Sequence, residues 1–132
     1  MPSPTRVQSY RTHIVTNLQS LIRIPSVAAD AEPKAPYGRP AAEALRMMLD
    51  RAAELGFAVR NVDNHAGHAQ YGDRGPLVAI LVHLDVVPAG DGWAHAPFGG
   101  EEENGCIFGR GASDNKGPAV AALYSLRAYA DQ

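Results

Sequence analysis

The stretch LVAILVHLDVVPAGDGW, residues 77–93, joins an apolar run to the polar side chains of His83 and Asp85. Its first half is apolar on both faces of an extended chain, which is typical of a central strand in a parallel sheet. The run ends in His83 and Asp85, and residues two apart on a strand point to the same side. Ligands bind at the carboxyl ends of strands in open α/β sheets. The pattern therefore predicts a buried strand that presents an imidazole and a carboxylate at a binding edge.

Helical and strand periodicities surround this run and set the fold class. The periodicity predicts helices over about residues 5–23, 40–55 and 115–130, strands at 57–62 and 68–72, and a hairpin within 101–110. Asn104-Gly105 marks the turn of the hairpin, and Gly56 suits the end of the second helix. The predicted class is α/β, with a central mixed, largely parallel sheet flanked by helices.

Composition excludes several kinds of partner. The 132 residues, 45% of them hydrophobic, suit one domain with a real core. A net charge of -2 gives no electrostatic reason to expect nucleic acid or an anionic membrane, and no apolar run is long enough to span a bilayer. The N-terminus lacks the apolar core of a secretory signal, and the single Cys106 permits no internal disulfide. We therefore expect a cytoplasmic protein without nucleic-acid or membrane partners.

A second polar motif, GRGASDNKG at residues 109–117, joins a predicted strand to a predicted helix. It presents Asp114 where a carboxylate could bind one metal ion or bridge two. Read alone, Asp114 could equally cap the helix, with the glycines serving the turn. His83 and Asp85 could likewise be a polar pair that closes a strand at a solvated loop. The spacing fits neither a dinucleotide-binding glycine motif nor a Walker phosphate loop.

Taken together, HLDVVPAGDGW and GRGASDNKG resemble the co-catalytic zinc metallopeptidase family of aminoacylase, glutamate carboxypeptidase, carnosinase and bacterial dipeptidases. Residues 18–27 resemble the opening helix and loop of that family. Residues 35–72 are similar to its dipeptidase V branch. The resemblance implies that residues 1–132 form the N-terminal segment of a zinc-dependent exopeptidase catalytic domain. This segment would be incomplete without a lid domain and a C-terminal catalytic segment.

The resemblance also implies a role for each polar residue of the two motifs. His83 would bind one zinc ion, Asp85 would orient the imidazole of His83, and Asp114 would bridge two metal ions. The family often has a cis peptide after this aspartate, here between Asp114 and Asn115.

Residues of the intervening loop would shape the substrate rim rather than bind metal. Asp91 and Trp93 match family positions of this kind. The family's general base belongs to a Glu-Glu pair beyond the helix that follows the second motif. Residues 101–103 precede that helix and are not this pair.

The activity implied is hydrolysis of dipeptides or other short amides with two divalent metal ions, zinc being the expected metal. Alone, this chain is expected to be inactive and to hold little or no metal, because stable zinc sites take three or four ligands. Three alternatives remain open. They are an N-acyl amino acid deacylase or desuccinylase of the same fold, a catalytically dead binding domain, and a piece cut from a larger protein. An uncovered sheet edge would also permit a homo-oligomer.

Overall fold

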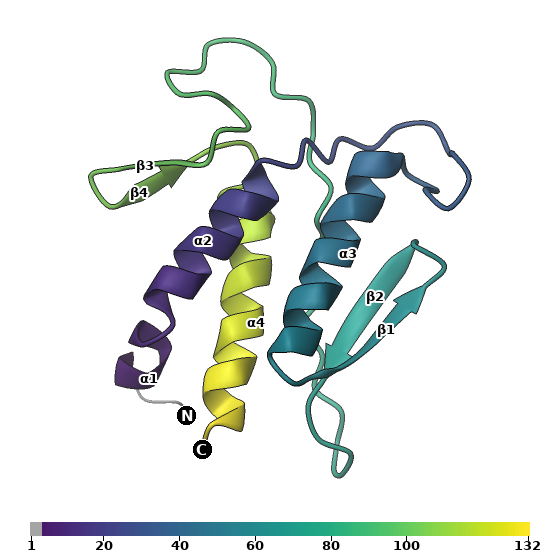
Figure 1. The fold of residues 1–132 in the computed structure, drawn as a ribbon, viewed down its shortest axis with the longest axis vertical. Coiled ribbons are helices and arrows are strands. Elements are labelled where there is room, and N and C mark those ends of the chain that lie inside the picture. Colours follow the sequence, from purple (N-terminus) through teal and green to yellow (C-terminus); the bar gives the residue numbers. More distant parts are fainter. Residues whose placement is uncertain (1–3) are drawn as a thin grey trace.

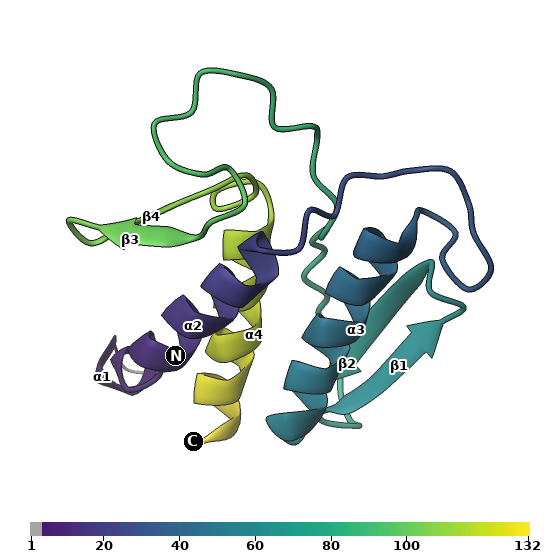
Figure 2. The same ribbon diagram turned by 45° about the horizontal axis from the view of Figure 1, so that its top comes forward.

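Three long helices packed side by side, a short helix at the start and two separate β-hairpins make up the computed structural model, which describes residues 4–132 (Figure 1). In chain order the elements are α1 (Pro4–Gln8), α2 (Arg11–Ile22), α3 (Arg39–Glu54), β1 (Ala58–Val62), β2 (Ala66–Gln70), β3 (Glu101–Glu103), β4 (Cys106–Phe108) and α4 (Lys116–Ala130). The α2 helix packs on α4, and α3 packs on the β1–β2 hairpin (Figure 2). Within residues 4–132, we find no helix that has both the length and the apolar composition of a membrane span.

The core lies between α2, α3 and α4. Leu21 and Ile22 at the end of α2 are completely buried, as is Ala44 of α3. Val120 and Tyr124 of α4 close the same cluster. The apolar faces predicted from helical spacing therefore meet one another, and their burial supplies most of the driving force for this arrangement.

Local signals in the sequence account for most element ends. Gly56 follows α3 with φ 85°, and its N–H donates to the carbonyl of Ala53. The N–H of Phe57 donates to the carbonyl of Ala52, which completes the hydrogen-bond pattern of a Schellman C-cap. The hairpin turn at Asn104-Gly105 has positive φ at both residues, as a type I′ turn requires. Both predictions are confirmed.

The predicted helix over residues 5–23 is interrupted. A turn at Ser9 and Tyr10 separates α1 from α2. The hydroxyl of Ser9 donates to the carbonyl of Arg6 at 2.7 Å. Serine side chains compete in this way with the main-chain hydrogen bonds of a helix, which periodicity alone does not reveal.

The α/β class is confirmed, but the expected central, largely parallel sheet is not formed among residues 4–132. Both sheets are two-stranded and antiparallel, and the single parallel pairing is an isolated bridge between Val27 and Val86. Residues 77–85 run as an extended segment without a neighbouring strand. Leu77 and Leu81 are 85% and 88% exposed. The reason is that a strand exists only when a second strand satisfies its N–H and C=O groups, and each hairpin here pairs within itself.

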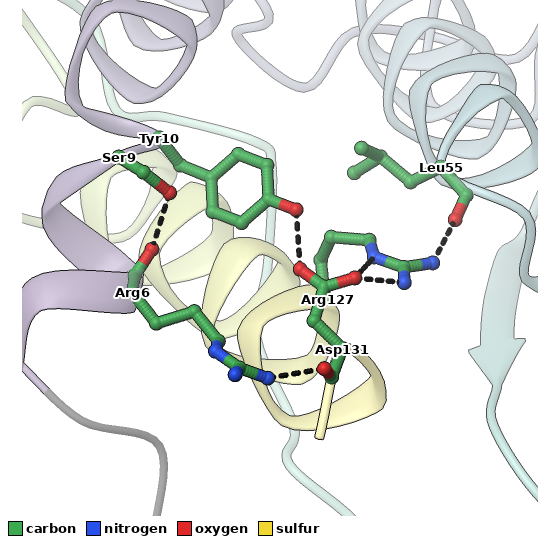
Figure 3. Close-up of polar contacts among 6 residues, drawn as sticks. All are labelled: Arg6, Ser9, Tyr10, Leu55, Arg127 and Asp131. Carbon is green, nitrogen blue, oxygen red and sulfur yellow. Dashed lines mark hydrogen bonds and ion pairs between the residues drawn. The ribbon is translucent and has the colours of Figure 1, made fainter.

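A charged network joins the far ends of three helices (Figure 3). Arg127 of α4 donates to the carbonyl of Leu55 at 3.0 Å and also binds the carboxylate of Asp131. Tyr10 donates to the same carboxylate, and Arg6 donates to the main-chain carbonyl of Asp131. The hydrogen bonds from Arg127 and Tyr10 lower the pKa of Asp131 below its usual value. The network holds α1 and the end of α3 against α4.

A leucine-to-alanine substitution at one buried and one exposed position tests the contrast between the core and the exposed segment 77–82. Leu21→Ala should lower the free energy of unfolding by about 2–5 kcal/mol, because it leaves a cavity in the core. Leu77→Ala should change it by less than about 0.5 kcal/mol, because that side chain is already in water. Urea denaturation of both variants measures the two values. A large loss in Leu77→Ala would show that residues 77–82 are buried in solution.

Candidate metal centre

The structure brings the three predicted polar residues of the two motifs together. The Nε2 atom of His83 lies 3.1 Å from Oδ1 of Asp114, although the two residues belong to different motifs. The Nδ1 atom of His83 lies 3.1 Å from the main-chain oxygen of Asp85 and 3.4 Å from its carboxylate. The imidazole therefore sits between two aspartates, with one ring nitrogen facing each.

These groups are open to water. The side chains of His83, Asp85 and Asp114 are 51%, 57% and 83% exposed. They line a hollow of about 210 Å³ together with the 109–111 turn, which is below the ~300 Å³ of usual small-molecule sites. A larger hollow beside α3 contains none of the three.

Imidazole nitrogen and carboxylate oxygen are both good donors for zinc. The donor atoms of His83 and Asp114 are of the types that zinc binds. The ring nitrogen of His83 that binds the ion must have lost its proton. Within the described part of the chain, no three His, Cys, Asp or Glu side chains are grouped so as to hold a metal ion. His83 and Asp114 therefore offer two donors, fewer than the three or four ligands of a stable zinc site. The metal-binding and orienting roles of His83, Asp85 and Asp114 stay predictions.

Two opposing effects set the pKa of His83. Desolvation lowers this pKa, but the hydrogen bonds to the Asp85 carbonyl and the Asp114 carboxylate outweigh it. The net effect is a pKa of His83 above its ordinary value.

The turn before α4 sets the position of Asp114. Gly111 has φ 89° and is buried, and a β-carbon there would collide with the side chains of Val86 and Lys116. Glycine is the residue that tolerates both conditions. The peptide bond between Asp114 and Asn115 is cis, as the family resemblance implies. Asn115 occupies the N-cap position of α4, so the alternative role of Asp114 as the cap is wrong.

Sequence reasoning missed several residues that hold the motifs in place. The side-chain oxygen of Asn115 accepts a hydrogen bond from the N–H of His83 at 3.3 Å. The hydroxyl of Ser26 donates to the carbonyl of Leu84 at 2.6 Å. Asn115 could have been suspected from its place beside Asp114, whereas nothing in the sequence connects Ser26 with residue 84.

The predicted rim residues lie on the loop between the motifs. Trp93 is half-buried, and its indole N–H donates to the carbonyl of Ala89 at 2.9 Å. Arg110 donates to the same carbonyl, and its guanidinium carbon lies 5.1 Å from the centre of the Trp93 ring. This cation–π contact fixes the loop against the second motif. Asp91 is exposed near the tip of the loop, and its role at a substrate rim is untested.

The pKa of His83 provides a test of the site geometry. In the metal-free chain, NMR titration of the His83 ring should give a pKa above 6.5, and Asp114→Asn should lower it by removing a carboxylate. The contact stabilises the fold fully below the unfolded pKa of about 6.5 and loses its effect as the pH rises through the folded value. Asp73→Asn, at an exposed position of another loop, is the control. An unchanged pKa in Asp114→Asn would contradict the contact.

Comparison with known proteins gives three results. The model of the peptidase family M20/M25/M40 matches residues 79–132. The chain is 39% identical over 120 residues to "Putative dipeptidase YtjP" of Bacillus subtilis (strain 168), covering 89% of this chain and 26% of that protein. It is 39% identical over 128 residues to "Putative dipeptidase SAUSA300_1697" of Staphylococcus aureus (strain USA300), covering 96% of this chain and 27% of that protein.

A solved structure is similar over nearly the whole chain. The crystal structure of human carnosine dipeptidase 1 superposes with a TM-score of 0.76 at 26% sequence identity, covering 96% of this chain and 30% of that one. The chain thus spans about a quarter of the length of the curated relatives it matches.

Proposed function

Because the chain belongs to the peptidase family M20/M25/M40, we propose that it is the N-terminal segment of the catalytic domain of a longer, zinc-dependent dipeptidase. The observation that carries this proposal is the 3.1 Å contact between His83 and Asp114. Two motifs that are distant in the sequence place a nitrogen and an oxygen donor at one point, as a metal site requires. The relatives' names favour dipeptides as substrates.

Each residue of the site has a proposed task. His83 holds one zinc ion, and Asp85 fixes the ring of His83 from the opposite side, since it faces the other nitrogen. Asp114 offers a carboxylate that can bridge two ions. Bound zinc would supply an activated water and polarise the scissile carbonyl. Asp91 and Trp93 lie on the loop that would border the substrate.

The rest of the catalytic machinery would come from outside these residues. A general base, further ligands and a lid domain are needed, and we propose that the isolated chain is inactive and retains little zinc. A cytoplasmic location fits dipeptide hydrolysis. The exposed apolar run at residues 77–82 would also allow the isolated chain to associate with itself.

A related amidase activity is the second candidate. An N-acyl amino acid deacylase or a desuccinylase would use the same His83 and Asp114 chemistry, and it differs in the groups that hold the substrate. The similarity to two proteins named as dipeptidases favours the first candidate. A binding domain without catalysis is the third, and the exposed run at 77–82 is the feature that favours it.

Zinc content and dipeptide hydrolysis of the 132-residue chain and of the full-length gene product test the proposal directly. The full-length protein should bind about two zinc ions and cleave dipeptides, and the chain alone should do neither. His83→Ala in the full-length protein should reduce kcat/KM by more than about 100-fold, and Asp85→Ala by about 10- to 100-fold.

His68→Ala, which removes an exposed histidine from β2, is the matched control and should leave the activity unchanged. Full activity of His83→Ala would refute the metal assignment. A full-length protein that binds zinc but cleaves only N-acyl amino acids would establish the second candidate. A full-length protein without zinc would leave only the binding-domain alternative.

A further inference from the structure

Both motifs of the metal centre are attached to the same short segment, residues 21–27, which ends α2 and leads out of it. We propose that Ser26 and Lys116 are positioning residues that fix the separation of His83 and Asp114 through this segment. The inference rests on the proposed function, because its purpose is the placement of zinc ligands. Among the hydrogen bonds of the described residues, none joins the side chain of Ser26 or Lys116 to the imidazole of His83 or the carboxylate of Asp114.

Ser26 holds the first motif. Its side chain is completely buried, and its hydroxyl donates to the carbonyl of Leu84 at 2.6 Å. Its own carbonyl accepts a hydrogen bond from the N–H of Val86 at 3.0 Å. The two partners flank Asp85, so the main chain of the motif is fixed on both sides of that residue. Val27 adds a parallel bridge to Val86.

Lys116 holds the second motif. It is the first residue of α4, lies two positions after Asp114 and is completely buried. Its ammonium group donates to the carbonyls of Leu21 at 2.8 Å and Ile24 at 2.7 Å. The carbonyl of Leu21 belongs to the last turn of α2, where the helix dipole attracts a cation, and that of Ile24 lies two residues beyond the end of the helix. The start of α4 is thereby attached to the end of α2.

The common attachment determines the ligand spacing. The hydroxyl of Ser26 and the ammonium of Lys116 each bind main-chain carbonyls, so they fix backbone positions and leave the donor side chains free for metal. Zinc sites require donor positions within a few tenths of an ångström, and a site displaced by about 1 Å loses much of its function. Loss of either attachment should therefore weaken zinc binding although no zinc ligand is altered.

The test compares Ser26→Ala and Lys116→Met with Tyr124→Phe. The control also removes a buried hydrogen bond between α2 and α4, which the hydroxyl of Tyr124 accepts from the side chain of Asn17. This bond lies away from the metal centre. Zinc affinity of the full-length protein is measured by competition with a chelating dye. Ser26→Ala and Lys116→Met should raise the zinc Kd by about 10- to 100-fold, and Tyr124→Phe by less than about 2-fold even where it lowers the melting temperature.

A metal-free readout separates this inference from the proposed function. In the 132-residue chain without zinc, Ser26→Ala should shift the NMR signals of the His83 ring, and Tyr124→Phe should not. Equal effects of Ser26→Ala and Tyr124→Phe on both readouts would overturn the inference. If the full-length protein binds no zinc, the proposed function fails, and the His83 ring signals still decide the inference. Ser26→Ala suffices if Lys116→Met does not fold.

Discussion

Hydrogen bonds from the buried ammonium of Lys116 attach the start of α4 to the segment that ends α2 and leads out of it. Removing a cation from water is costly unless hydrogen bonds replace its solvation, and here the Leu21 and Ile24 carbonyls do so. Burial lowers the pKa of Lys116 to about 8, so the group stays mainly charged at neutral pH. The N–H of Lys116 also binds the carbonyl of Gly111 at 3.0 Å. One residue therefore joins the end of α2, the start of α4 and the turn that carries Asp114.

Within the stretch 77–93, residues 84–86 are held by main-chain hydrogen bonds, whereas residues 77–82 are not. Residues 84–86 are fixed because Ser26 satisfies their main-chain groups. Residues 77–82 have no such partner among residues 4–132, and their large side chains remain in water. The site geometry can therefore form without the sheet that the apolar run suggests. His83 lies between these two parts, and its N–H donates a hydrogen bond to the side-chain oxygen of Asn115.

The sequence predicts those features that neighbouring residues determine, and it does not predict those that depend on residues far away in the chain. The helices, the Gly56 cap and the Asn104-Gly105 turn follow from short-range rules, and the structure has them, although the first predicted helix is divided at Ser9 and Tyr10. A strand at residues 77–85 was wrong because strand formation depends on a partner, which hydrophobicity does not specify. Ser26 and Lys116 were missed because their acceptors are carbonyls 58 and 95 residues away. Every residue has a carbonyl, so such contacts leave no pattern in the sequence.

The hydrogen bonds that raise the pKa of His83, to the Asp85 carbonyl and the Asp114 carboxylate, lie at the proposed zinc site. Two aspartates face the two nitrogens of one imidazole, and this arrangement favours positive charge at that point. A proton and a zinc ion compete for the ring nitrogens of His83, because a nitrogen must lose its proton to bind the metal. Water screens these exposed carboxylates. Any segment that covered the site would strengthen their attraction, and it would do so more for a doubly charged ion than for a proton.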